Sequence, residues 1–251
     1  MIRSFYIAGT AMATQADRMD VLTNNLTNVD TTGYKKDKLI SRSFSDVLME
    51  RLNDPYVISA TNQIGLQNNG IHIDEIVTDF SQSGFDETAR PSDLALEGAG
   101  FFVVETPQGD MYTRDGNFFV NAQGDLVNAD GHYVAGTNGH IRVGSGDFAV
   151  NAAGEVIVGG QIVNRVRLAA FDDLTGLRKS ANNLYTNASN QPVRTPAGIN
   201  VKQGYLETSN VDTAEEMVRM LELTRSFSFN QRVLSMVDQS LQKTVNEVGR
   251  V

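Results

Sequence analysis

The sequence predicts an α+β protein. Helices at the two ends of the chain pair as a coiled coil, and a central all-β domain rich in hairpins lies between them. Near both termini, apolar side chains recur at alternating steps of three and four residues, the pattern of a helix with one apolar seam. Between these ends, short apolar runs alternate with glycine-containing turns, which is typical of antiparallel β structure.

The C-terminal segment predicts the longer helix. A capping box, Thr213-Ala-Glu-Glu216, opens it, because the Thr side chain can bond the first free N–H groups. At 1.5 Å per residue this helix is about 55 Å long, too long for one small domain to cover, so it needs a second helix or further copies of the chain. Its predicted seam consists of Met220, Leu223, Phe227, Asn230, Leu234, Val237, Leu241, Thr244 and Val248.

The N-terminal segment predicts a second helix, from Ile2 to about Asn28 and ~40 Å long. It ends at Asn28-Val-Asp-Thr-Thr-Gly33, whose residue types favour turns. Two helices alone leave much apolar surface in water, so we expect both to become firm only in a bundle of many copies. The predicted seam of this helix consists of Ile2, Phe5, Gly9, Met12, Ala16, Met19, Thr23 and Leu26.

The stretch from 35 to 70 shows no clear period and predicts an extended connector. Within it, the spacing of Phe44, Val47, Leu48 and Leu52 predicts a brief helix. The predicted organisation is an inner helical domain made of residues 1–34 and 206–251, the connector at 35–70 and the central β domain at 71–205.

The central β domain is long enough to bury a core. Two of its stretches echo one another, Phe118-Phe-Val-Asn-Ala-Gln-Gly-Asp-Leu-Val127 and Phe148-Ala-Val-Asn-Ala-Ala-Gly-Glu-Val-Ile157. Each predicts a strand, an Asn-x-x-Gly turn and a returning strand. We therefore expect one type of hairpin to be used twice, which is too few copies for a solenoid.

Composition argues against several classes of function. The 251 residues include no cysteine, which excludes disulfides, thiolate metal sites and cysteine nucleophiles. A net charge of -9 without a Lys/Arg cluster argues against binding nucleic acid. No apolar run approaches the ~20 residues of a membrane span, so we expect no membrane insertion. The segment Met1-Ile-Arg-Ser-Phe5 lacks the apolar core of a signal peptide, so we expect any export to proceed without a cleaved signal.

We expect no catalytic, metal-binding or cofactor-binding site. The stretches Gly98–Gly100 and Gly144–Gly146 lack the spacing and the following helix of a phosphate loop, so turn glycines are the favoured interpretation. The acidic run from Asp110 to Asp130 lacks the order of a calcium-binding EF-hand, and hairpin turns account for it. Zinc-type ligand spacing is absent around the three histidines, His72, His132 and His140.

Three regions of the chain carry further motifs. Leu22-Thr-Asn-Asn-Leu-Thr-Asn-Val-Asp-Thr-Thr-Gly-Tyr-Lys35 closely resembles the N-terminal signature of the flagellar rod and hook protein family. The stretches Leu94–Val103 and Tyr112–Phe118 look like the start of its middle domain, and Gln203–Asp212, followed by Glu216, Met217 and Arg225, looks like its C-terminal signature. The residues at signature positions are Asn24, Asn25, Asn28, Gly33, Gly98, Gly100, Gly204, Ser209 and Asn210.

The resemblance implies a structural, non-enzymatic axial protein of the bacterial flagellum, more similar to distal than to proximal rod proteins. In that family the terminal helices form the innermost domain of a hollow tube. The implied partners are further copies of the chain, other rod proteins and the hook protein, with surrounding ring proteins as a further candidate. The implied location is the flagellar basal body, reached through the flagellar type III pathway without a cleaved signal peptide. No cofactor is implied.

Alternatives remain open at this point. Asn24, Asn25 and Asn28 are either solvated capping residues or inter-subunit hydrogen-bonding groups near the interior of the tube. The chain is alternatively another axial component, of proximal-rod or hook type. A surface adhesin with a coiled-coil stalk predicts a signal peptide, and an enzyme acting on cell-wall glycan predicts a catalytic role for Asp115 or Glu97.

Overall fold

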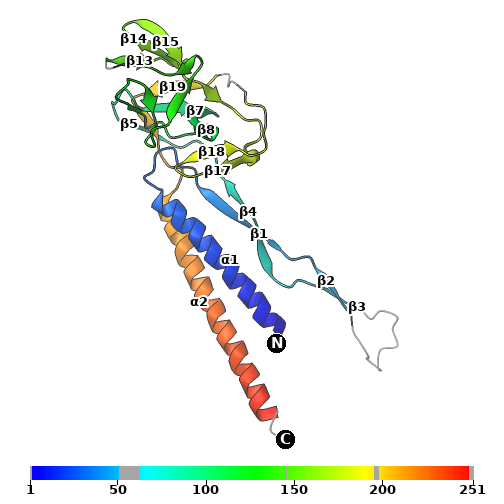
Figure 1. Cartoon of the computed structure of the whole chain (residues 1–251). Coiled ribbons are helices and arrows are strands. Elements are labelled where there is room, and N and C mark those ends of the chain that lie inside the picture. The colour runs from blue at the N-terminus through cyan, green and yellow to red at the C-terminus, as the bar shows by residue number, and fades with distance from the viewer. Residues whose placement is uncertain (1, 51–62, 145, 195–197, 249–251) are drawn as a thin grey trace. The chain divides into compact units, whose positions relative to one another are not determined.

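The protein is α+β, with one long helix at each end of the chain and β structure between them (Figure 1). The computed structural model describes residues 2–50, 63–144, 146–194 and 198–248. The chain folds as two compact units. The helical unit comprises Met1–Leu26, Asp37–Val77 and Thr213–Val251, and the β unit comprises Thr27–Lys36 and Thr78–Asp212.

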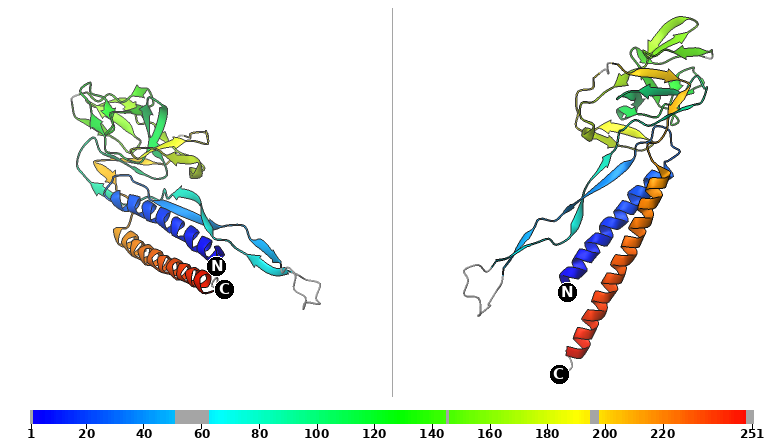
Figure 2. Two further views of the ribbon diagram at one scale, coloured as in Figure 1. Left: turned by 60° about the horizontal axis from the view of Figure 1, so that its bottom comes forward. Right: turned by 180° about the vertical axis from the view of Figure 1, so that it is seen from behind.

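The helical unit contains helix α1, Ile2–Thr27, and helix α2, Thr213–Lys243, which continues into a π-helical turn at Thr244–Val248. The two helices run antiparallel beside each other, and α2 extends past the N-terminal end of α1 (Figures 1 and 2). Gln15 joins them, because its Nε2 donates to Ser226 Oγ at 2.6 Å and its Oε1 accepts from Asn230 Nδ2 at 3.2 Å. The predicted end of the N-terminal helix, at about Asn28, is confirmed to within one residue, because α1 ends at Thr27. The pairing of the two helices as a coiled coil stays a prediction.

Two-stranded ribbons complete the helical unit. Strand β1, Asp37–Ser43, pairs with β4, Ile71–Thr78, and β2, Val47–Glu50, pairs antiparallel with β3, Gln63–Gln67. The prediction of a brief helix is wrong over Val47–Glu50, because this segment bonds to a partner strand that a local pattern cannot reveal. Leu52, like the rest of 51–62, lies outside the described residues.

A single chain does not bury the predicted seam of α1. Instead, the buried residues are Ala8, Thr14, Leu22 and Asn25. The ribbon of β1 and β4 covers the side of α1 that carries these buried residues. Arg18 Nη2 donates to Ser41 Oγ at 2.6 Å, and Asn25 exchanges two hydrogen bonds with the backbone of Asp37. Of the seam residues, Phe5, Gly9, Ala16 and Thr23 are exposed, Met12, Met19 and Leu26 are partly buried, and the side chain of Ile2 lies outside the described part.

The α2 seam is partly buried from Met220 to Leu241. Met220, Leu223, Phe227, Asn230, Leu234, Val237 and Leu241 are all half-buried, whereas Thr244 is exposed and the side chain of Val248 lies outside the described part. The predicted capping box is wrong, because Thr213 is the first residue of α2 and not the residue that precedes it. The contact of the Glu216 side chain is with Arg219, at 3.5 Å, and not with the Thr213 amide, because the carboxylate turns into the unit and is buried there.

The β unit is built around one large antiparallel sheet with the strand order β17-β18-β8-β7-β11-β10-β9, while β12 pairs with β11 and β16 with β7. Smaller sheets are β13-β14-β15, β19-β6 and β20-β5. A short 3-10 helix lies at Leu174–Gly176. The strands are β5 Phe85–Glu87, β6 Leu94–Glu97, β7 Phe101–Thr106, β8 Gly109–Thr113, β9 Phe119–Val120, β10 Leu126–Val127, β11 Tyr133–Gly136, β12 Gly139–His140, β13 Phe148–Val150, β14 Glu155–Val158, β15 Gln161–Arg165, β16 Leu168–Ala169, β17 Leu177–Lys179, β18 Leu184–Asn187, β19 Asn200–Gln203 and β20 Tyr205–Glu207.

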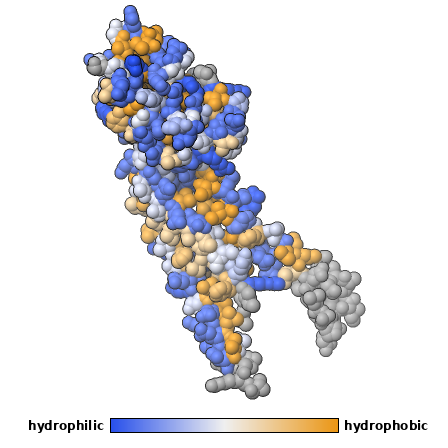
Figure 3. Space-filling view, in the orientation of Figure 1, coloured by the Kyte–Doolittle hydropathy of each residue, from blue (hydrophilic) through white to orange (hydrophobic). Residues whose placement is uncertain are grey.

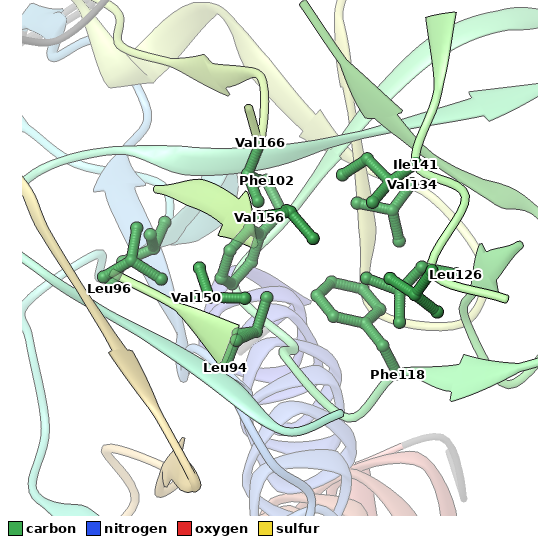
Figure 4. Close-up of a cluster of buried hydrophobic side chains, with 12 residues drawn as sticks. Leu94, Leu96, Phe102, Phe118, Leu126, Val134, Ile141, Val150, Val156 and Val166 are labelled. Carbon is green, nitrogen blue, oxygen red and sulfur yellow. The ribbon is translucent and has the colours of Figure 1, made fainter. Parts of the chain in front are cut away.

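Strand β7 lies at the centre of the sheet and separates two hydrophobic cores. Successive side chains of a strand point to opposite faces, so Phe102 packs into one core and Phe101 and Val103 into the other. The first core gathers Leu94, Leu96, Phe118, Leu126, Ile141 and Val156 around Phe102 (Figure 4). The second is aromatic, with the Phe101 and Tyr185 ring centroids 5.9 Å apart in an edge-to-face arrangement.

The repeated hairpin is confirmed. Asn121 Oδ1 accepts from the amides of Gln123 and Asp125, and Asn151 Oδ1 accepts from the equivalent amides of Ala153 and Glu155. The side chain of Asn128 closes a third turn of this type, which the sequence comparison missed. In each case the Asn side chain replaces a backbone partner, which is the reason this residue type starts the turn.

Candidate functional site: a buried ion-pair cluster

The three signature regions meet at one place in the β unit. The backbone N–H of Gly33 donates to the carbonyl of Glu207 at 2.7 Å, and Arg114 Nη2 donates to the carbonyl of Gly98 at 2.9 Å. Asn210 accepts from the amide of Lys36 at 2.7 Å. We call Gly33, Lys35, Arg114, Glu207 and Asn210 the signature cluster.

Glu207 is the shared anion of this cluster. Its Oε1 accepts from Lys35 Nζ at 2.6 Å, and its Oε2 lies 3.3 Å from Arg114 Nη1. The side chains of Glu207, Lys35 and Arg114 are at most 3% exposed. Lys35 Nζ also donates to the carbonyl of Ser81, and the Arg114 guanidinium lies over the Phe101 ring, 5.2 Å from its centroid. One carboxylate therefore holds two buried cations from distant parts of the chain.

Burial shapes the protonation of the two cations. Removal from water lowers the pKa of Lys35 and of Arg114, because desolvation disfavours the charged forms. The hydrogen bond and the charge of Glu207 act in the opposite direction on the pKa of both groups. Glu207 therefore favours the charged forms of both cations in the interior.

Backbone proximity explains the glycine at position 33. Gly33 has φ +63°, in the left-handed region, and a Cβ placed on it would lie 2.5 Å from the Arg114 carbonyl carbon and from the Asp115 nitrogen. No side chain fits there. Among the other signature glycines, Gly98 and Gly204 also have positive φ, at +123° and +78°.

Asn210 and Ser209 fasten the end of the β unit. Asn210 Nδ2 donates to the carbonyl of Asp79 at 2.8 Å, so the residue bridges two segments of the chain with one side chain. The Ser209 carbonyl accepts from Ser83 Oγ at 2.9 Å, and its own hydroxyl accepts from the amide of Val211. Both residues therefore have clear structural roles within one chain.

The asparagines of the N-terminal signature divide between the two units. Asn25 is buried and its side-chain amide bonds to the backbone of Asp37 in the same chain. This contact favours neither of the predicted roles, a solvated cap or an inter-subunit hydrogen bond. Asn28 closes a turn, since Thr31 donates from its amide to the Asn28 carbonyl and from its hydroxyl to Asn28 Oδ1. Asn24 is exposed.

Asp115 lies beside the cluster and binds the turn that follows Asn28. Its Oδ1 accepts from Thr32 Oγ1 at 2.6 Å and from the amide of Asn117 at 3.0 Å. Burial raises the pKa of Asp115 above its usual value of 3.8, and these two hydrogen bonds oppose the rise. The other carboxylate considered for catalysis, Glu97, forms a surface ion pair with Lys202 at 3.2 Å.

Asp115→Asn is expected to flatten the pH dependence of stability. The raised pKa means that the folded state binds the proton more tightly, so this contribution to stability is full below 3.8 and is lost as pH rises through the folded-state pKa. Asn keeps the acceptor oxygen and does not ionise. In urea titrations from pH 3.5 to 7.5, we expect the variant to gain on the order of 1 kcal/mol relative to wild type. Asp86→Asn, on an exposed strand carboxylate, is the control, and parallel curves for Asp115→Asn and wild type would contradict the assignment.

Within the described residues, no group of three or more His, Asp or Glu side chains is placed to hold a metal ion. His140 Nδ1 lies 3.2 Å from Glu105 Oε2 and its ring stacks on Tyr133, while His72 stacks on Phe44. Neither described helix is long and apolar enough to cross a membrane. The signature cluster joins three distant segments of the chain through buried ion pairs, which is a structural arrangement.

The sequence prediction named Gly33 and Asn210 but missed the three charged residues of the cluster. Lys35 closes the first signature stretch, and Arg114 and Glu207 lie inside the others. The available signal was that Lys35, Arg114 and Glu207 stand among turn-forming and apolar residues in these stretches. That signal does not reveal burial, because the partners lie up to 172 residues apart.

Known family models match the same three regions. The model described as "Flagella basal body rod protein" matches residues 5–35, "Flagellar hook protein FlgE/F/G D1 domain" matches 95–158, and "Flagellar basal body rod FlgEFG protein C-terminal" matches 202–247. Each matched segment contributes one charged residue of the signature cluster, namely Lys35, Arg114 and Glu207 in turn. The matched segments thus meet in the folded β unit.

Full-length relatives give the same result. The chain is 31% identical to the flagellar hook-basal body complex protein FlhO of Bacillus subtilis (strain 168) over 271 residues, with 100% of both chains covered. It is 34% identical to the flagellar basal-body rod protein FlgG of Buchnera aphidicola subsp. Baizongia pistaciae over 259 residues, covering 97% and 98%. Identity to the rod protein FlgF of Caulobacter vibrioides is 28% over 254 residues, with full coverage of both.

Fold, signature cluster and relatives together define a structural protein of the bacterial flagellum. The chain belongs to the flagellar basal-body rod protein family.

Proposed function

We propose that copies of this chain polymerise into the rod of the flagellar basal body, a hollow shaft that transmits torque from the rotor to the hook, and that the chain takes a distal position in it. The observation that carries the proposal is the coverage of the relatives. Identity of 31% and 34% extends over 97% or more of each chain. A structural role also fits the chemistry of the signature cluster, where the charged groups are bound to one another and not to a reaction site.

Exposed apolar side chains on α2 support polymerisation. The seam residues are half-buried in one chain, and on other faces of the helix Leu221, Phe229 and Met236 are 60–65% exposed. Hydrophobic surface is visible along the helical unit in Figure 3. Apolar surface of this kind marks an interaction site that an assembled state covers. We assign the helices α1 and α2 to the inner wall of the tube, the ribbons of β1 to β4 to the connector and the β unit to the outer domain.

The proposed partners are further copies of this chain, other rod proteins and the hook protein, with ring proteins as a further candidate. Export proceeds through the flagellar type III pathway without a cleaved signal peptide, and the chain has no enzymatic activity. The net charge of -9 supports a function without nucleic acid.

Leu234→Asp is expected to abolish assembly. A carboxylate in a buried seam without a partner costs several kcal/mol, while the substitution leaves the β unit untouched. The experiment complements a deletion strain and counts hooks and filaments by electron microscopy. The matched control is Ser235→Asp, one residue further along α2 on an exposed position.

We expect wild type and Ser235→Asp to restore flagella and Leu234→Asp to leave bare basal bodies. Normal flagella with Leu234→Asp would refute the seam. Normal flagella in the uncomplemented deletion strain would refute the rod function itself, and the adhesin and glycan-enzyme alternatives would then gain.

A further inference from the structure

A pocket of about 340 Å³ lies within the helical unit, between α1, β1 and α2. Its apolar wall is formed by Val21, Leu22, Leu39 and Leu223. Charged side chains line the remainder, and those of Lys38, Arg219 and Glu222 are exposed, so the pocket opens to solvent. An apolar wall with a charged end suits a long side chain that has an aliphatic stem and a charged head.

Glu216 is one of the charged residues that line the pocket, and one of its carboxylate oxygens has no donor among the described residues. Glu216 is 1% exposed, and its Oε1 lies 3.5 Å from Arg219 Nη1. Its Oε2 is buried and accepts no hydrogen bond from any described residue. An unsatisfied buried acceptor of a charged group destabilises a protein, so a donor that enters the pocket gains the full value of this interaction.

Arg225 is a donor without an acceptor in the described part of the chain. It is exposed on α2 and forms no hydrogen bond or ion pair with a described residue. It lies nine residues after Glu216, which is two and a half helical turns and about 13.5 Å along the axis. The two side chains therefore project from opposite faces of one helix and do not meet within a chain.

We infer that Arg225 of one copy of this chain enters the pocket of a neighbouring copy and donates to Glu216 Oε2 there. The stem packs on Leu39 and Leu223, and the guanidinium forms a charge-assisted hydrogen bond. Donor and acceptor are on opposite faces of the same helix, so the contact is heterologous, the type of contact that builds a helical tube when the rotation between copies does not close a ring. The inference rests on the proposed function and names one contact of its subunit interface.

Charge reversal tests the contact in the complemented deletion strain. A lost charge-assisted hydrogen bond weakens each subunit contact by about tenfold to a hundredfold. We expect Glu216→Arg and Arg225→Glu each to lower the fraction of cells with hooks by at least that lower factor, and the double variant to restore it. Arg232→Glu, another exposed arginine of α2, is the matched control and should retain flagella.

The outcomes separate this contact from the rod function. Flagella at wild-type frequency with Arg225→Glu would overturn the contact. This result can be interpreted even if Glu216→Arg does not fold, because Arg225 is exposed and its substitution leaves the fold intact. A double variant no better than Arg225→Glu alone, with the helical circular dichroism of wild type, would overturn it as well. Both results leave the rod function intact, since that is decided by the deletion strain and by Leu234→Asp.

Discussion

Glu207→Gln is expected to lower the free energy of unfolding by about 3–5 kcal/mol, the cost of removing one partner from a buried ion pair. Glutamine has nearly the same size, so packing is retained. Lys35 and Arg114 then remain 0% and 3% exposed without a counter-charge. The loss is large because one carboxylate serves both cations and the amide of Ser83.

Urea unfolding of the purified chain measures this effect, with Glu97→Gln as the control. Glu97 pairs with Lys202 at the surface, where the side chains are 48% and 37% exposed, and such a pair contributes less than ~1 kcal/mol. A second readout is specific to Lys35. Without Glu207 its folded-state pKa falls further below 10.5, so the variant regains stability as pH rises between that lowered pKa and 10.5. Equal losses in the two variants would contradict a buried ion-pair cluster.

Gly33→Ala is expected to cost about 2–5 kcal/mol, from two sources that add. The left-handed conformation at φ +63° costs an L-residue ~1–2 kcal/mol. The new methyl group would also lie 2.5 Å from backbone atoms of Arg114 and Asp115, which cannot rotate away, and such overpacking costs about 1–3 kcal/mol. To make room for the methyl group, the backbone at position 33 would move away from Arg114. This movement would weaken the hydrogen bond from the Gly33 N–H to the Glu207 carbonyl and displace Lys35 from Glu207.

Gly139→Ala isolates the conformational part. Gly139 has φ +80°, and a Cβ there meets no atom within 4 Å. We expect a loss of ~1 kcal/mol for this variant and a distinctly larger one for Gly33→Ala, compared by thermal and urea unfolding. If the two variants lose the same free energy of unfolding, the close approach of the Arg114 and Asp115 backbone to Gly33 does not contribute to the cost of the substitution.

Local features of the fold were predictable from the sequence. Heptad spacing located both helices, because a helix is specified by contacts three and four residues apart. The Asn-x-x-Gly stretches located the hairpins at Asn121 and Asn151, because the Asn side chain bonds amides within the same turn. In each case the residues that determine the structure are neighbours in the chain.

Long-range features were not predictable in this way. The buried side of α1 depends on a ribbon whose contact residues, such as Ser41 and Asp37, carry no period. The burial of Lys35 depends on Glu207, and a charged residue in a turn-rich stretch is ordinarily solvated. Residues 35 and 36, placed by the sequence in the connector, belong to the β unit for that reason.

The order in which these residues occur along the chain also bears on when the protein can fold. The β unit is closed by Glu207, which bonds a lysine 172 residues earlier, and by β20, which pairs with β5 more than a hundred residues before it. A chain that emerges from a channel N-terminus first lacks these closing partners until nearly all of it has passed. Contacts of such high sequence separation also form slowly. For a subunit exported along the proposed route, topology alone thus delays folding of the β unit until nearly the whole chain has left the channel.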